Sequence, residues 1–176
     1  MNKRNTFIIA VAIPLLILLA MTVKPAASVL LGQEILLKTV AVDPNDLFRG
    51  EYVALDFKIS TIRKSMLPDS VKQYTGKQMK DIPLFVSLKP EGKFYVVDTV
   101  SEKKPDLGIY LKAKLRYYDY NDMADSVHLD YSLDKYFVKQ GSGKELQEQS
   151  NKGELVGKVK VLNGYGILTG VEPSSN

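Results

Sequence analysis

Apolar and polar residues alternate along most of the chain beyond residue 29. In residues 109–118 every second position is apolar, while Tyr110, Lys112 and the following alternate positions form a polar side. The same period of two recurs in residues 126–133, where Val127 is on the apolar side and His128 on the polar side. This period is typical of a β-strand with one buried and one solvated face.

Further strands are predicted where short segments carry the same alternation or a run of β-branched residues. These segments are residues 34–42, 51–59, 82–89, 93–100, 154–162 and 165–171. Turn sequences separate several of them: Gly92 lies in "KPEGK", and Asn163-Gly164 is a strong hairpin signal. About eight short strands joined by tight turns predict a mainly β fold, an antiparallel β-sandwich or open barrel.

Two short helices interrupt the predicted strands. Ser142 and Glu145 form a capping box at the start of "SGKELQEQSNKG", and Gly153 is placed to close this helix in the left-handed conformation. A second helix is predicted near residues 68–74. The expected domain is therefore a β structure with one or two small helices.

The N-terminal segment has a different pattern. Residues 7–23, "FIIAVAIPLLILLAMTV", carry no charge and approach the length that crosses a hydrocarbon core of about 30 Å. Lys3 and Arg4 precede this run, so the positive-inside rule places residues 1–6 in the cytoplasm and residues 29–172 outside it. We expect a single pass through the inner, cytoplasmic membrane, with a periplasmic or cell-surface domain.

A cleaved signal peptide is the alternative for this N-terminal segment. Residues 25–28, "PAAS", offer small side chains for cleavage, but the apolar run exceeds a usual signal-peptide core and Lys24 follows it directly. Both interpretations give an extracytoplasmic domain.

Composition and charge exclude several classes of function. The net charge is +4, but without Lys3 and Arg4 the chain has 22 Lys and Arg against 20 Asp and Glu. This balance lacks the basic stripe of nucleic-acid binding, so no nucleic-acid partner is predicted. The chain has no cysteine, which excludes disulfides, thiolate chemistry and a lipoprotein anchor.

The segment "DPNDLFRGEYVALDF", residues 43–57, combines a turn with a strand. Asp43 is a good N-cap, Pro44 suits the first helical position, and Asp46 favours a helix N-terminus. Gly50 falls where such a turn would end and need positive φ. The pattern indicates a rigid corner that starts a core strand, whose apolar face includes Leu55 and Phe57.

A binding role is the alternative for this corner. Arg49, Glu51 and Tyr52 bring a cation, a carboxylate and an aromatic ring together at the joint between turn and strand. With Gly50 they are the candidate ligand or partner contacts.

The residues of this corner resemble the signature of the GDYXXLXY family, a bacterial membrane-linked family. Gly-Asp-Tyr-x-x-Leu-x-Tyr corresponds to residues 50–57, with Glu51 in place of aspartate and Phe57 in place of the final tyrosine, so one hydroxyl is lost. Residues 129–147, which contain Tyr136 and Phe137, resemble a second block of the family, and residues 32–44 and 164–171 resemble its first and last strands.

What the resemblance implies is an N-terminal transmembrane helix and no established activity. Family members are often encoded beside a polytopic membrane protein, which implies a membrane complex. No catalytic residue, metal or cofactor follows from it.

One short motif resembles a catalytic sequence. "SMLP", residues 65–68, matches the Ser-Met-x-Pro of type I signal peptidases, and Lys139 is available as the amine of a Ser–Lys dyad. The order along the chain differs, because the peptidase serine precedes its Gly-Asp strand whereas Ser65 follows Gly50. A four-residue match carries a high risk of coincidence.

Metal sites are not predicted either. His128 is the only histidine and there is no cysteine, which disfavours zinc. The acidic turn at residues 119–125 lacks the spacing and closing glutamate of an EF-hand calcium loop.

From these observations and the family resemblance together, we expect a non-enzymatic accessory or interaction subunit of a membrane complex. The alternatives are a module that binds a small ligand or an envelope polymer, and a signal-peptidase-like hydrolase.

Overall fold

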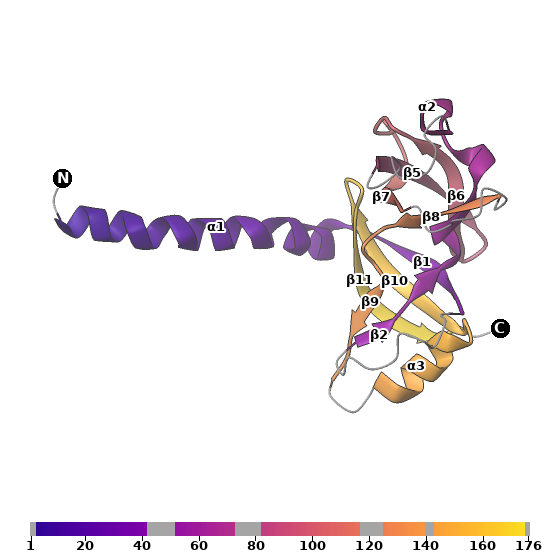
Figure 1. The fold of residues 1–176 in the computed structure, drawn as a ribbon. Helices are drawn as coiled ribbons and strands as arrows, with labels where there is room; N and C mark the ends of the chain where they lie inside the picture. The colour runs from indigo at the N-terminus through magenta and orange to yellow at the C-terminus, as the bar shows by residue number, and fades with distance from the viewer. Residues whose placement is uncertain (1–2, 42–51, 73–81, 117–124, 140–142, 175–176) are drawn as a thin grey trace.

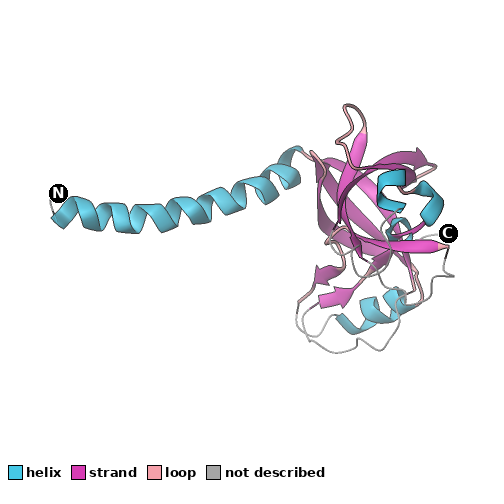
Figure 2. Ribbon diagram, turned by 45° about the horizontal axis from the view of Figure 1, so that its top comes forward, coloured by secondary structure: helices cyan, strands magenta, loops and turns pink. Residues whose placement is uncertain are grey.

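A computed structural model describes residues 3–41, 52–72, 82–116, 125–139 and 143–174 (Figure 1). It has a long N-terminal helix that projects from one side of a β domain. The strands wrap around a common core, and the helices of the domain lie at its periphery (Figure 2). The mainly β fold predicted by the alternation is confirmed.

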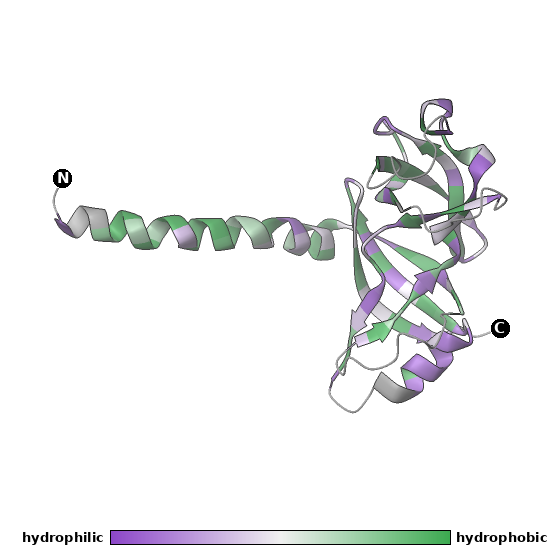
Figure 3. Ribbon diagram, in the orientation of Figure 1, coloured by the Kyte–Doolittle hydropathy of each residue, from purple (hydrophilic) through white to green (hydrophobic). Residues whose placement is uncertain are grey.

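Helix α1 (Lys3–Leu31) runs without a break through Pro14 and Pro25. Its segment Phe7–Leu31 is long and apolar enough to cross a membrane, and none of its most apolar stretch is buried in the protein. Figure 3 shows that most of the ribbon of α1 carries the colour of hydrophobic residues. The apolar helix thus extends eight residues beyond the predicted end at residue 23, because Lys24 is its only charged residue after Arg4.

Two antiparallel sheets, each forming half of a barrel, enclose the core. The first has the order β11-β10-β1-β3, made of β1 (Gln33–Val40), β3 (Asp56–Phe57), β10 (Leu155–Leu162) and β11 (Tyr165–Pro173). The second has the order β4-β8-β7-β5-β6, made of β4 (Thr61–Arg63), β5 (Ile82–Glu91), β6 (Phe94–Ser101), β7 (Ile109–Arg116) and β8 (Ser126–Asp130). An isolated bridge from Leu111 to Gly164 joins the two sheets at one end.

The core consists of the apolar side chains that point inward from both sheets. Fully buried members include Ile35, Leu37, Leu84, Val86, Leu111, Leu115, Leu129, Leu155 and Val159. In β7 and β8 these are the positions that the alternation predicted, which confirms the period-two interpretation.

One hairpin and one helix end carry the predicted turn chemistry. Asn163 and Gly164 both have positive φ (51° and 78°), as a two-residue hairpin turn between β10 and β11 requires. Gly153, with φ of 68°, closes helix α3 (Gly143–Asn151), and its N–H donates to the carbonyl of Ser150 at 2.9 Å.

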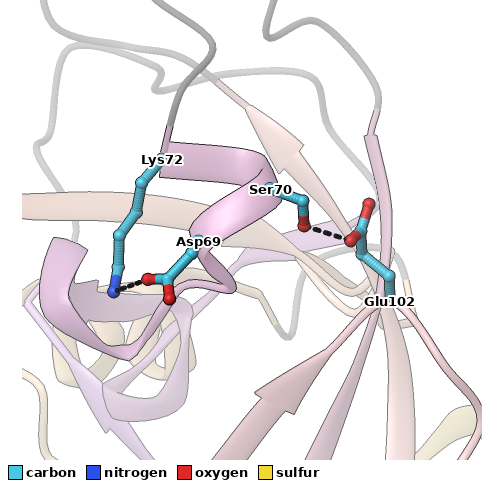
Figure 4. Close-up of polar contacts among 4 residues, drawn as sticks. All are labelled: Asp69, Ser70, Lys72 and Glu102. Atoms are coloured by element: carbon cyan, nitrogen blue, oxygen red, sulfur yellow. Dashed lines mark hydrogen bonds and ion pairs between the residues drawn. The ribbon is translucent and has the colours of Figure 1, made fainter.

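The second predicted helix is a single turn, α2 (Asp69–Lys72), preceded by the 3₁₀ turn η3 (Lys64–Met66). Lys72 pairs with Asp69 at 2.9 Å and lowers the pKa of that carboxyl, while the Ser70 hydroxyl donates to Glu102 just beyond β6 (Figure 4). The Ser70–Glu102 contact links α2 to the end of β6 in the second sheet, whereas the Lys72–Asp69 pair lies within α2.

The predicted single strand over residues 51–59 is wrong. The described residues from Tyr52 to Arg63 instead form β2 (Tyr52–Ala54), β3, the 3₁₀ turn η2 (Lys58–Ser60) and β4. Each piece pairs with a different partner: β2 with β9 (Lys135–Phe137), β3 with β1, and β4 with β8. The chain bends between them, although the predicted apolar side, Val53 to Ile59, is buried as expected.

Two smaller predictions also need correction. Tyr110 was expected on the solvated side of its strand but is buried, because its ring lies against Gly164 of the β10–β11 hairpin. The strand predicted over residues 126–133 ends at Asp130, since Ser132 has a φ of 58° that breaks the extended backbone.

Helix α1 joins the domain directly. Only Gly32 separates Leu31 from β1, and its N–H donates to the carbonyl of Ser28 at 2.9 Å. Ser28 is 1% exposed, and Lys24 Nζ lies 4.9 Å from the centre of the Tyr165 ring. The end of α1 therefore packs against β10 and β11.

Candidate functional site

The two sequence blocks that carry the family resemblance meet in the two-stranded ribbon β2–β9. Tyr52 pairs directly with Phe137 and Val53 with Tyr136. Adjacent residues of a strand point to opposite faces. Tyr52 and Phe137 therefore share the outer face of the ribbon, while buried Val53 and half-buried Tyr136 face the core.

The outer face of the ribbon is an aromatic pair with a cation beside it. The rings of Tyr52 and Phe137 are 6.0 Å apart and inclined at 62°, an edge-to-face arrangement. Lys135 Nζ lies 5.1 Å from the centre of the Tyr52 ring. Phe137 is 72% exposed, so most of its ring is accessible to solvent.

Helix α3 clamps the other edge of β2. The Ala54 N–H donates to Gln147 Oε1 at 3.0 Å, and the Ser150 hydroxyl donates to the Ala54 carbonyl at 2.6 Å. Both backbone groups of Ala54 are thereby satisfied, as a strand edge requires when it is not paired. Gln147 Nε2 donates to Asn151 Oδ1 at 2.8 Å, which holds the amide in place.

The later residues of the motif are structural. The Leu55 N–H donates to the Asp134 carbonyl at 2.9 Å, and both Leu55 and Phe57 are buried. The Phe57 ring fills the space over Gly157, where an added Cβ would lie 2.7 Å from the ring. Leu55 and Phe57 are thus buried, as members of the predicted apolar face of this segment.

Six predicted residues lie outside the described part of the chain. They are Asp43, Pro44, Asp46, Arg49, Gly50 and Glu51. The capped turn and the binding role of Arg49 and Glu51 stay predictions. Of the four candidate binding residues, Tyr52 is the one that the structure places, beside Phe137.

Sequence reasoning did not single out Lys135, Gln147 or Ser150. Lys135 is two residues before Phe137, so period two already placed it on the same face. The hydrogen bonds of Gln147 and Ser150 join residues more than ninety positions apart, and a single sequence carries no signal for them.

The residues of the hydrolase alternative occupy different parts of the domain. Ser65 is exposed on η3, directly before α2. Lys139 follows β9, and Figure 1 places α2 and β9 toward opposite ends of the domain. This separation does not resemble a Ser–Lys dyad, which needs hydrogen-bond contact.

Metal-binding geometry is likewise missing from the described residues, among which no three His, Asp or Glu side chains gather. His128 is half-buried on β8. Of the acidic turn at residues 119–125, only Asp125 is described; it is exposed, and its carbonyl accepts the Lys64 N–H at 2.8 Å.

Together these features define an apolar N-terminal helix joined directly to an antiparallel β domain that displays an aromatic ribbon. The chain belongs to the GDYXXLXY family, whose model, described as GDYXXLXY protein, matches residues 14–171. No curated protein and no solved structure matches the chain.

Proposed function

We propose that this protein is a non-enzymatic accessory subunit of a membrane complex. In this proposal α1 anchors the chain once in the cytoplasmic membrane. The β domain lies on the extracytoplasmic side and docks to a polytopic membrane protein through the β2–β9 ribbon. The family's frequent association with genes for polytopic membrane proteins supports this kind of partner.

The observation that carries the proposal is the exposure of Phe137. The fold brings the two motif blocks together, and the result is an aromatic edge-to-face pair in which Phe137 is 72% exposed. Aromatic residues are enriched at protein–protein interfaces and among the residues that contribute most to binding. A cation beside the pair, Lys135, adds a contact of defined charge.

The anchor and its orientation rest on α1. Its apolar segment Phe7–Leu31 makes a span of 25 residues with exposed side chains, which suits a lipid environment. Lys3 and Arg4 at its start favour a cytoplasmic N-terminus. The packing of Ser28 and Lys24 against the domain supports a helix that is retained after export.

The test is affinity purification of the full-length protein from its own membranes in mild detergent. A stoichiometric polytopic protein, identified by mass spectrometry, is expected with the wild type and is expected to be lost with Phe137→Ala. The matched control is Leu107→Ala, which shortens another highly exposed apolar side chain (89%) outside the ribbon. Equal recovery of the partner protein with both variants would show that the ribbon is not part of the interface.

Binding of an envelope polymer is the second candidate. The exposed ring of Phe137, next to the Tyr52 ring that Lys135 flanks, also suits a sugar polymer, because this arrangement combines an apolar face with polar neighbours. Sedimentation of the purified protein with isolated cell-wall polymer distinguishes the two. Co-sedimentation that Phe137→Ala abolishes, together with no membrane partner, would favour the polymer.

A further inference from the structure

We propose that the β10–β11 hairpin contacts the lipid headgroup layer of the membrane that α1 crosses, with Tyr165, Lys24 and Lys112 as its lipid contacts. This inference rests on the membrane anchoring proposed above and concerns a surface distinct from the β2–β9 ribbon. It starts from the length of α1 and its direct joint to the domain.

The length of α1 places its last turns at the outer membrane surface. Twenty residues from Phe7 rise about 30 Å, the thickness of a hydrocarbon core, and end at Ala26. The remaining five residues, 27–31, rise about 7 Å, which is close to the depth of one headgroup layer. The domain therefore begins, at Gly32, near the outer limit of that layer.

Exposed apolar side chains continue along these last turns. Leu30 and Leu31 are 77% and 75% exposed and continue the apolar surface of the spanning segment. Lys24 lies within one turn of the hydrocarbon boundary, where a lysine extends its amine toward the headgroups. Its Nζ reaches the face of Tyr165, 4.9 Å from the ring centre.

The contact with Lys24 fixes the depth of the hairpin. Tyr165 is the first residue of β11 and follows the turn Asn163-Gly164. Figure 1 shows the end of α1 beside β11, and α1 also contacts β10. Tyrosine is enriched at the membrane–water interface because its ring is apolar and its hydroxyl is polar.

Charge at the hairpin fits phosphate-bearing headgroups. Lys112 is exposed, its N–H donates to the Gly164 carbonyl at 2.8 Å, and its side chain passes beside Gly164. Lys24 on α1 thus lies beside Tyr165, and the stem of Lys112 on β7 lies beside Gly164 with its Nζ 5.8 Å from the centre of the Phe85 ring. The acidic residue nearest in register, Glu34, lies opposite Lys160 on β1 and β10. Lysines near a membrane surface are attracted to anionic lipids.

The absence of tryptophan from the chain permits a direct test. Three variants of the full-length protein each carry one tryptophan: Leu16→Trp in α1, Tyr165→Trp in the hairpin, and Ser70→Trp on α2, which lies on the side of the domain away from α1 in Figures 1 and 2. Each is reconstituted into phosphatidylcholine–phosphatidylglycerol vesicles with lipids that carry a quencher at the headgroup or in the acyl chain.

The expected result is that headgroup quenchers remove more than about half of the Tyr165→Trp fluorescence and leave Ser70→Trp nearly unchanged. Acyl-chain quenchers should act most strongly on Leu16→Trp. Quenching of Tyr165→Trp no stronger than that of Ser70→Trp, with Leu16→Trp fully quenched, would overturn the hairpin contact and leave the anchor intact. Loss of quenching at Leu16→Trp would instead refute the anchor.

Two controls keep the test decisive. Far-ultraviolet circular dichroism checks that each variant folds, and Lys112→Trp, at an exposed position beside Gly164, replaces Tyr165→Trp as the probe if the latter does not. Lys112→Gln in the Tyr165→Trp background should weaken headgroup quenching in vesicles that contain phosphatidylglycerol and change it little in pure phosphatidylcholine. If Lys112→Gln changes headgroup quenching equally in both kinds of vesicle, Lys112 does not contact the anionic headgroups.

Discussion

The hydroxyl of Tyr131 donates a hydrogen bond to the Ile59 carbonyl at 3.0 Å in the interior of the domain. Ile59 belongs to η2, one of the short pieces into which residues 52–63 divide. A bent segment leaves carbonyls to which no sheet partner donates, and a buried carbonyl without a donor is costly. Tyr131 satisfies one of them from a position beyond β8.

Tyr131→Phe should therefore lower the free energy of unfolding by about 1–3 kcal/mol, because it leaves the Ile59 carbonyl buried without a donor. Thermal or urea unfolding of the purified protein in detergent measures the change. Tyr95→Phe, which removes a hydroxyl from half-buried Tyr95 on β6, is the control and should change stability by less. Equal effects of the two variants would contradict the role given to Tyr131.

The same residue gives a pH dependence. Burial raises the pKa of the Tyr131 hydroxyl well above its ordinary value of about 10. The folded protein keeps this proton where the unfolded chain releases it, so its contribution to stability is complete below pH about 10 and declines as the pH rises further. Unfolding midpoints measured from pH 9 to 11, roughly around that ordinary value, should fall more steeply for wild type than for Tyr131→Phe.

The alternation of apolar and polar residues predicts burial correctly where a side chain simply faces the core. It fails where a segment distant in sequence covers the side chain. Leu111, Leu115 and Leu129 follow the alternation and are buried as it requires. Tyr110 does not, because the hairpin that covers it comes from a segment more than fifty residues later in the chain. Phe137 shows the same limit, since alternation gives its face but not its exposure.

At the scale of the element, α3 acts as the lateral support of β2. A strand of three residues has few ladder hydrogen bonds of its own, and the two contacts to Ala54 supply the missing edge. The position of the aromatic pair therefore depends on α3, although the hydrogen bonds of α3 go to the backbone of Ala54 and not to either ring.

Ser150→Ala should lower stability by about 1 kcal/mol and accelerate amide hydrogen exchange in β2, since the buried hydroxyl no longer donates to the Ala54 carbonyl. Hydrogen exchange followed by mass spectrometry gives the local measurement. Glu148→Ala, at an exposed position of the same helix, is the matched control. Unchanged exchange in β2 would show that Gln147 alone holds the edge.

The elements with a regular pattern could be predicted from the sequence, including β5, β7, β10 and the Asn163-Gly164 hairpin. The segment from Tyr52 to Arg63 could not, because its alternation of apolar residues is continuous while its partner strand changes twice, from β9 to β1 to β8. Which strand each piece joins is decided by contacts with β1, β8 and β9, far away in sequence. The aromatic ribbon could not be predicted for the same reason, because it exists only through the pairing of β2 with β9.

At the scale of the whole molecule, the joint at Gly32 determines how the helix and the domain are connected. An added Cβ at this position would lie 2.2 Å from the Ser28 carbonyl oxygen and 3.1 Å from the Val161 nitrogen. The same Ser28 carbonyl accepts the Gly32 N–H. Any residue with a Cβ would therefore clash with the backbone at this joint, which only glycine avoids.

Gly32→Val should open the joint while the β domain keeps its fold. Limited digestion with proteinase K is expected to cut near residues 28–33 faster than in wild type, while the thermal unfolding midpoint of the domain changes little. Gly170→Val is the control, because an added Cβ there meets no atom closer than 3.7 Å. A joint as resistant as that of wild type would show that α1 and β1 tolerate the side chain.

In the proposed membrane anchoring, the direct joint would also make the domain responsive to the bilayer itself. A helix whose apolar length exceeds the hydrocarbon thickness accommodates the difference by tilting, and thicker or thinner membranes change the angle. Only one glycine separates the helix from the sheet, and Ser28 and Lys24 pack on the domain. A change in the tilt of α1 would therefore rotate the β domain with it. The thickness of the surrounding lipid would then set the direction in which the aromatic ribbon is presented to a neighbour.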